Sequence, residues 1–128
     1  MILILQVESI LKTHPLVENI CVYGDSYRSY TVALVAPSKP HIEAIAHKLG
    51  KTVSFEKLLE DKDVKEAVLK ELVIHGTRGR LEKFELPQAV TLVHEQWTPE
   101  SGLTTASFKM KRRVIQNFYQ QQINRMYA

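Results

Sequence analysis

The sequence has few of the residues that build covalent cross-links or membrane spans. Cys21 is the one cysteine among 128 residues, so an internal disulfide is excluded and a reducing compartment is favoured. Because Cys21 lies within an apolar run, we expect a buried, structural thiol. No apolar run approaches the roughly 20 residues that a helix needs to cross a bilayer, and no signal-peptide pattern is present. Residues 1–5 are apolar but short, and we interpret them as an edge where a neighbouring domain attaches.

Motifs for self-contained catalysis are also lacking. The five histidines are scattered without metal-ligand spacing, so no metal site is expected. Neither GxxxxGK[ST] nor GxGxxG occurs, so the sequence has no phosphate cradle of its own. Asp25 and Ser26 lack the glycine elbow that presents a catalytic serine, and we interpret them as a hairpin turn. The histidines are His14, His41, His47, His75 and His94.

What is present is the composition of an ordinary globular domain. Hydrophobic residues make up 45% and charged residues 24%, close to the average for folded proteins, so one domain spanning residues 1–128 is expected. The formal net charge of +3 is mildly basic. It would suit an anionic ligand such as a nucleotide, but it also fits any small basic protein.

The order of expected elements favours the α+β class, because strands and helices do not alternate regularly. Two β-rich runs flank a polar turn after Gly24 and predict an antiparallel hairpin. Alternation of Tyr30, Val32 and Leu34 places these three side chains on one face of it. Asp61 is expected to cap the longest helix. The expected helices are 6–13, 38–49, 55–59, 61–76 and one beginning in 109–113, and the expected strands are 17–23, 30–36 and 89–93.

The segment with the strongest functional signal lies near the end of the chain. A turn-rich loop, WTPESGLTTAS (residues 97–107), runs into the block KMKRR (residues 109–113), which has four cations over five positions. Such a loop can deliver Lys109 into a cleft of another domain, since lysine is a compact charge on a long stem. The alternative is a solvated basic first turn of the final helix, although cations there oppose the helix dipole.

A nucleic-acid site is the third interpretation of the basic block, since Phe108 and Phe118 are nearby. It is disfavoured because the rest of the chain is not strongly basic. Phe118 is also expected on the core face of the final helix. The other members of that face are Ile115, Tyr119, Ile123 and Met126.

Two long segments resemble a known family. PLVENICVYGDSYRSYTVALVAPS resembles the hairpin of the C-terminal domain in the adenylate-forming superfamily, particularly its long-chain acyl-CoA synthetase branch. KFELP, WTPESGLTT and KMKRR, in that order, resemble the end of those enzymes, so the likeness spans about residues 7–127. The resemblance implies that residues 1–128 form the small α+β lid domain of an AMP-forming acyl-CoA ligase, without its large N-terminal domain.

The resemblance also implies an activity for the intact enzyme. Fatty acid and ATP, with Mg²⁺, give an acyl-adenylate and pyrophosphate, and CoA then displaces AMP to give the thioester. The lid rotates between these steps against the large N-terminal domain, which is its expected partner. We expect the fragment alone to bind no cofactor and to be inactive. The intact enzyme is expected inside the cell, attached to endoplasmic reticulum, mitochondrial or other membranes through segments outside this region.

The resemblance assigns roles to individual cations. In the superfamily a lysine after Ser-Gly binds the reacting carboxylate and phosphate oxygens, and Lys109 stands at that position after Ser107 and Phe108. Lys111, Arg112 and Arg113 would support the loop or contact nucleotide phosphates. The rival hypothesis is a stand-alone module that reuses the fold to bind a nucleotide, an acyl-CoA or a partner protein.

Overall fold

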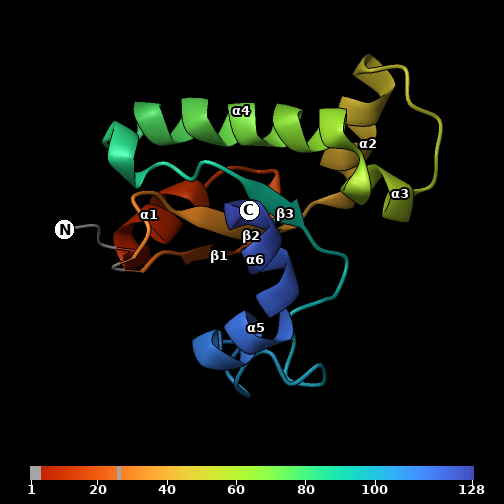
Figure 1. Ribbon diagram of the computed structural model, residues 1–128. Coiled ribbons are helices and arrows are strands. Elements are labelled where there is room, and N and C mark those ends of the chain that lie inside the picture. The colour runs from red at the N-terminus through yellow and green to blue at the C-terminus, as the bar shows by residue number, and fades with distance from the viewer. Residues whose placement is uncertain (1–3, 26) are drawn as a thin grey trace.

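A three-stranded sheet in the order β1-β2-β3 organises the computed structural model, which describes residues 4–25 and 27–128 (Figure 1). β1 (Val17–Tyr23) and β2 (Val32–Pro37) pair antiparallel, from Val17 opposite Pro37 to Tyr23 opposite Val32. β3 (Val90–Leu92) runs parallel to β2. The expected hairpin and the α+β class are therefore confirmed. Ser26 of the expected turn and residues 1–3 of the apolar start lie outside the described residues.

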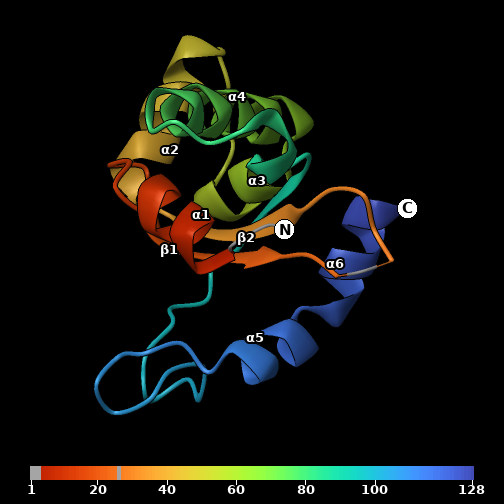
Figure 2. The same cartoon turned by 90° about the vertical axis from the view of Figure 1, so that its left-hand side faces the viewer.

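Both faces of the sheet are covered, and for this reason every residue of β2 is buried. Side chains of alternate strand residues point to opposite faces. Ala33 and Val35 belong to one core cluster, while Leu34 and Ala36 belong to the other. Figure 2 shows α2, α3 and α4 on one side of the sheet and α6 on the other. The molecule therefore has two hydrophobic cores separated by one sheet.

The helices begin and end close to the signals in the sequence. Asp61 caps α4 as expected, because its carboxylate accepts a hydrogen bond from the Val64 N–H at 3.1 Å. α1 begins at Ile4, two residues earlier than expected, and ends at Leu11. The helices are α1 (Ile4–Leu11), α2 (Lys39–Lys48), α3 (Phe55–Glu60), α4 (Lys62–Arg78), the short 3₁₀ turn η1 (Lys83–Glu85), α5 (Arg112–Phe118) and α6 (Gln120–Tyr127).

The final helix begins at Arg112, within the predicted range, but it differs from its prediction in two ways. It is divided into α5 and α6 at Tyr119, whose backbone angles of φ −105° and ψ 22° are not helical. Phe118, predicted on the core face, is 57% exposed. The reason is the spacing of Ile115, Tyr119 and Ile123, which lie four residues apart and fill the second core. Phe118 therefore falls on the flank of the helix.

Histidines that are far apart in the sequence meet at the end of α1. The ring centroids of His41 and His75 lie 6.1 Å and 5.0 Å from that of His14. His14 Nδ1 accepts a hydrogen bond from the Leu16 N–H at 2.9 Å, and its Nε2 lies 3.6 Å from a Glu71 carboxylate oxygen. Within residues 4–25 and 27–128 no group of three or more His, Cys, Asp or Glu side chains is placed to hold a metal ion. No described helix is long and apolar enough to cross a membrane.

This histidine cluster predicts a loss of stability in acid. Burial, followed by the repulsion from His75 and His41, lowers the pKa of His14 below 6.5, against an opposing effect of Glu71. The unfolded chain therefore binds the proton more readily than the folded chain. The free energy of unfolding should be fully retained above pH 6.5 and should decline below it, by at most about 1.4 kcal/mol per pH unit from this residue.

The measurement is urea denaturation at a series of pH values from 7.5 to 5. His14→Gln should flatten the decline, whereas His47→Gln, at an exposed histidine outside the cluster, should leave the slope unchanged. An identical slope in wild type and His14→Gln would show that His14 does not govern the acid sensitivity.

Candidate functional site

Lys109 lies in a tight loop that is closed by hydrogen bonds of Thr105. The Thr105 N–H donates to the Lys109 carbonyl at 2.8 Å, and the Phe108 N–H donates to the Thr105 carbonyl at 2.8 Å. The Lys109 N–H also donates to the Thr105 hydroxyl at 3.2 Å. These bonds fix the backbone of residues 105–109, while the Lys109 side chain is exposed. The loop therefore presents a cation from a defined backbone.

The base of the loop is pinned by a short antiparallel bridge. Thr104 pairs with Met110, and the Lys111 N–H donates to the Leu103 carbonyl at 2.9 Å. Leu103 and Thr104 are buried, so the loop emerges directly from the second core. Sequence reasoning missed this bridge because the Thr, Ser, Pro and Gly content of residues 97–107 indicates turns and carries no strand pattern.

Phe108 occupies a backbone position in the loop that favours glycine. Its φ of 64° lies in the left-handed region, which glycine adopts without a steric penalty. The resemblance implies glycine at this position. The Phe108 side chain is 66% exposed, so it clears the loop. Phenylalanine here costs about 1–2 kcal/mol of backbone strain, which the hydrogen bonds of Thr105 must offset.

Arg112 anchors the C-terminal side of the loop to the far end of the chain. Its Nη1 donates to Glu8 Oε2 at 2.8 Å, and its Nη2 donates to Glu8 Oε1 at 2.6 Å. Glu8 is 5% exposed and also accepts the Val22 N–H at 2.7 Å. A bidentate arginine–carboxylate pair is strong and directional. The interaction therefore joins α1, β1 and the start of α5 at one point.

Glu8 was not predicted as a site residue. The one signal for it in the sequence is a carboxylate between Val7 and Leu11, on the apolar side of a short helix. The structure buries it there. Of the four predicted cations, Lys109, Lys111 and Arg113 are exposed, and Arg112 turns inward.

Cys21 lies buried beside this ion pair. The Arg112 guanidinium approaches its sulfur at 3.7 Å. Burial and the nearby Glu8 carboxylate raise the pKa of the Cys21 thiol to about 11. The thiol is therefore neutral at physiological pH, and the prediction of a buried structural cysteine is confirmed.

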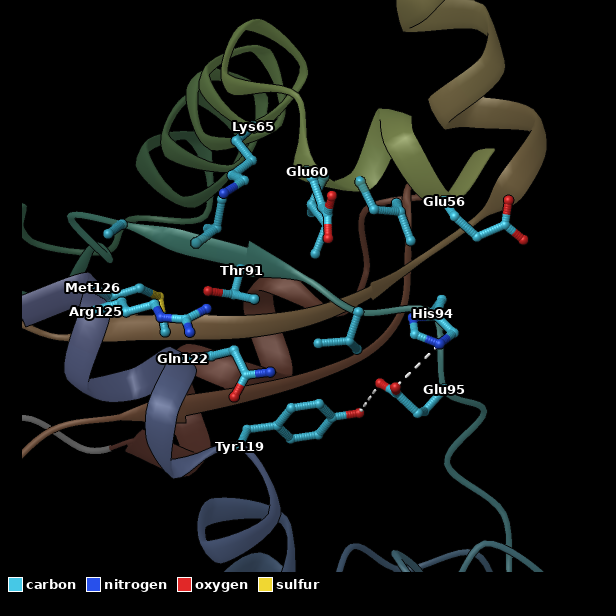
Figure 3. A pocket seen from close by; sticks show the side chains of 15 residues that line it. Glu56, Glu60, Lys65, Thr91, His94, Glu95, Tyr119, Gln122, Arg125 and Met126 are labelled. Atoms are coloured by element: carbon cyan, nitrogen blue, oxygen red, sulfur yellow. Dashed lines mark hydrogen bonds and ion pairs between the residues drawn. The ribbon is translucent and has the colours of Figure 1, made fainter. Parts of the chain in front are cut away.

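A concave feature lies along β3. It has a volume of about 510 Å³ and is bounded by α3, the start of α4, β3 and α6 (Figure 3). At one end the Tyr119 hydroxyl donates to Glu95 at 2.8 Å and accepts from the Trp97 indole N–H at 3.2 Å. His94 Nε2 lies 3.2 Å from the other Glu95 oxygen. Burial raises the pKa of Tyr119, so its hydroxyl remains a donor.

Comparison with known proteins gives a family match over most of the chain. The model of the family described as "AMP-binding enzyme C-terminal domain" matches residues 6–109. "Long chain acyl-CoA synthetase 8" of Arabidopsis thaliana is 40% identical over 124 residues, which cover 96% of this chain and 17% of that protein. "Long-chain-fatty-acid--CoA ligase 4" of Saccharomyces cerevisiae is 34% identical over 125 residues, covering 95% of this chain and 18% of that protein. The chain thus spans less than a fifth of these relatives.

Solved structures show the same fold. The A-PCP didomain of carboxylic acid reductase from Segniliparus rugosus, solved in complex with AMP, superposes with a TM-score of 0.79. It is 27% identical, and the match covers 98% of this chain and 16% of that one. The adenylation domain of a carboxylate reductase from Mycobacterium chelonae gives a TM-score of 0.78 at 26% identity, covering 96% of this chain and 17% of that one.

The Glu8–Arg112 pair predicts strong coupling between the two ends of the chain. Arg112→Gln leaves the Glu8 carboxylate buried with only the Val22 N–H as partner. Removing one member of a buried pair typically costs 3–5 kcal/mol. Because the Arg112 side chain is 32% exposed, we expect a loss of about 2–3 kcal/mol in the free energy of unfolding.

Chemical denaturation of a double-mutant cycle checks this coupling. Glu8→Gln combined with Arg112→Gln should cost clearly less than the sum of the single losses. Lys51→Gln, which removes ion pairs with Asp63 at 3.1 Å and with Asp61 at 3.3 Å, is the control. It should have a smaller effect, because neither of these carboxylates is as deeply buried as that of Glu8. Additive losses at residues 8 and 112 would contradict the coupling.

Proposed function

Because the chain belongs to the family of AMP-binding enzyme C-terminal domains, we propose that it serves as the lid domain of a long-chain fatty-acid–CoA ligase. The intact ligase converts fatty acid, ATP and CoA to acyl-CoA, AMP and pyrophosphate. The observation that carries the proposal is Lys109, an exposed cation on a loop closed by Thr105. The family match and the ligase relatives support the reaction class.

Lys109 is proposed as the catalytic residue of the first half-reaction. Attack of a fatty-acid carboxylate on the α-phosphate of ATP brings two anions together. A fixed cation between them offsets their repulsion and stabilises the charge that develops as pyrophosphate leaves. The closed backbone of residues 105–109 favours this role, because it limits the positions that the Lys109 ammonium can occupy.

The remaining cations divide into two proposed roles. Lys111 and Arg113 are exposed and are free to contact nucleotide phosphates once the large domain is in place. Arg112 has both Nη atoms bonded to Glu8, which favours support of the loop over contact with phosphate. Lys111 and Arg113 thus remain the better candidates for cofactor binding.

The large N-terminal domain of the same enzyme is the proposed partner, and it would supply the binding sites for ATP, CoA and fatty acid. Mg²⁺ accompanies ATP and neutralises phosphate charge. The described part of this chain has no cluster of acidic ligands placed to hold it, so we assign Mg²⁺ to the large domain and the ATP phosphates. We further propose an enzyme inside the cell, attached to endoplasmic reticulum, mitochondrial or other membranes through segments outside these residues.

The proposal predicts that Lys109 acts in only one half-reaction. The chain should replace the segment that it matches in Arabidopsis long chain acyl-CoA synthetase 8, and the chimera should retain ligase activity. Lys109→Ala in the chimera should lower fatty-acid-dependent ATP–pyrophosphate exchange about 100- to 1000-fold. CoA-dependent consumption of synthetic acyl-AMP should change only a few-fold, because the rotated lid presents another face in that step.

Two further variants complete the test. Lys109→Arg should not fully restore exchange, since a planar guanidinium does not replace a compact ammonium. Lys48→Ala, at an exposed lysine on α2, is the matched control and should leave both half-reactions unchanged. An inactive chimera would favour the rival hypothesis, in which the chain is a stand-alone binding module. Equal losses in both half-reactions would mean that Lys109 has no catalytic role and is part of a solvated basic turn.

A further inference from the structure

β3 leaves one edge of its backbone open. The Ala89 carbonyl accepts a hydrogen bond from β2 at 3.0 Å, and the Val93 N–H donates one to β2 at 2.9 Å. Alternate residues of a parallel strand bond to the same neighbour. Val90 and Leu92 therefore direct their N–H and C=O groups away from β2. Among the strands of residues 4–25 and 27–128, none pairs with β3 on that side.

This open edge is the floor of the concave feature described above, which we call the β3 groove. Its walls are α3 and the start of α4 on one side and α6 on the other (Figure 3). The volume of about 510 Å³ falls within the usual range for ligand sites. Since the walls flank the open backbone, the groove has the form of a slot for an extended chain.

Charge is divided along the β3 groove. Figure 3 places Lys65 and Arg125 beside the start of β3, Glu60 between Lys65 and Glu56, and Glu56 beyond the end of β3 with His94 and Glu95. Among the described residues, neither Lys65 nor Arg125 has an ion-pair partner, and Glu56 also has none. A ligand of one sign would be repelled at one end of the slot. An occupant with an acidic group at one end and a basic group at the other would be attracted at both.

We propose that the β3 groove binds an extended segment of a separate partner protein, which adds a strand to β3. The segment carries an acidic side chain near Lys65 and Arg125 and a basic side chain near Glu56. Main-chain hydrogen bonds to Val90 and Leu92 supply the pairing, and the charges set its direction and register. This partner surface is additional to the proposed ligase chemistry, because it involves none of the loop residues 105–109.

Lysines near an exposed edge strand often prevent it from pairing with another chain. The test must therefore show whether Lys65 prevents strand pairing or contributes to binding. The probes are the capped peptides Ac-Lys-Val-Thr-Val-Thr-Glu-NH₂ and Ac-Glu-Val-Thr-Val-Thr-Lys-NH₂. The first matches the charges when it runs antiparallel to β3 and the second when it runs parallel. Amide NMR of the 128-residue chain should show that at least one of them protects the Val90 and Leu92 N–H groups from exchange. The Val93 N–H, already bonded to β2, is the internal control and should not gain protection.

Variants test the charges and the backbone separately. Arg125→Glu and Lys65→Glu should each weaken peptide binding about tenfold, which corresponds to about 1.4 kcal/mol. Lys70→Glu, elsewhere on α4, should not weaken it. N-methylation of the peptide amides that face β3 should abolish binding, whereas methylation of the alternate amides should preserve it.

Two results would overturn the proposal. One is that neither peptide, at millimolar concentration, changes the exchange of the Val90 and Leu92 N–H groups. Lys65 and Arg125 would then serve to keep other strands from pairing with β3. The other is binding to the 128-residue chain but not to the chimera, which would mean that a segment of the large domain fills the groove in place of a separate partner. Failure of the Lys109 experiment would not affect either readout.

Discussion

The rest of the site depends on one buried ion pair. Glu8 is held away from water and accepts two hydrogen bonds from Arg112 and one from the Val22 N–H. A carboxylate in such a place is stable only while these donors remain. The pair therefore fixes where α5 starts, and α5 in turn fixes the exit of the loop that carries Lys109. Without this joint the loop would be attached to the domain only through the Thr104–Met110 bridge and the second core.

The same constraint separates the two kinds of cation in the basic block. A guanidinium is planar and can bind both oxygens of one carboxylate, so arginine suits the buried joint. A lysine ammonium is strongly hydrated and is carried on a flexible stem, so Lys109 and Lys111 suit exposed positions. Arg113, which forms no ion pair within the described residues, is exposed as well. Four cations that look alike in sequence thus divide into one structural member and three available to a ligand.

Local patterns predicted the hairpin and the Asp61 cap because each depends on neighbouring residues. The break at Tyr119 was missed, since it follows from how Ile115 and Ile123 fit the second core, which no local pattern specifies. The Glu8–Arg112 pair was missed for a related reason. Its partners are 104 residues apart, and a single carboxylate in a short helix does not reveal what it faces. Lys109 was predicted from the order of the loop and the basic block, whereas the Thr105 hydrogen bonds depend on the folded shape of the loop, which no sequence pattern specifies.

The 104 residues between Glu8 and Arg112 in the sequence also set an order of events during synthesis on the ribosome. When α1 leaves the exit tunnel, Glu8 must stay hydrated, because its guanidinium partner lies 104 residues further on. Desolvating the carboxylate early would cost several kcal/mol. We therefore expect the helix bearing Glu8 to pack fully against β1 only after Arg112 has emerged. The first helix of the domain is then among the last parts to be secured, and a nascent chain stalled before residue 112 would keep an unpaired acidic group at its surface.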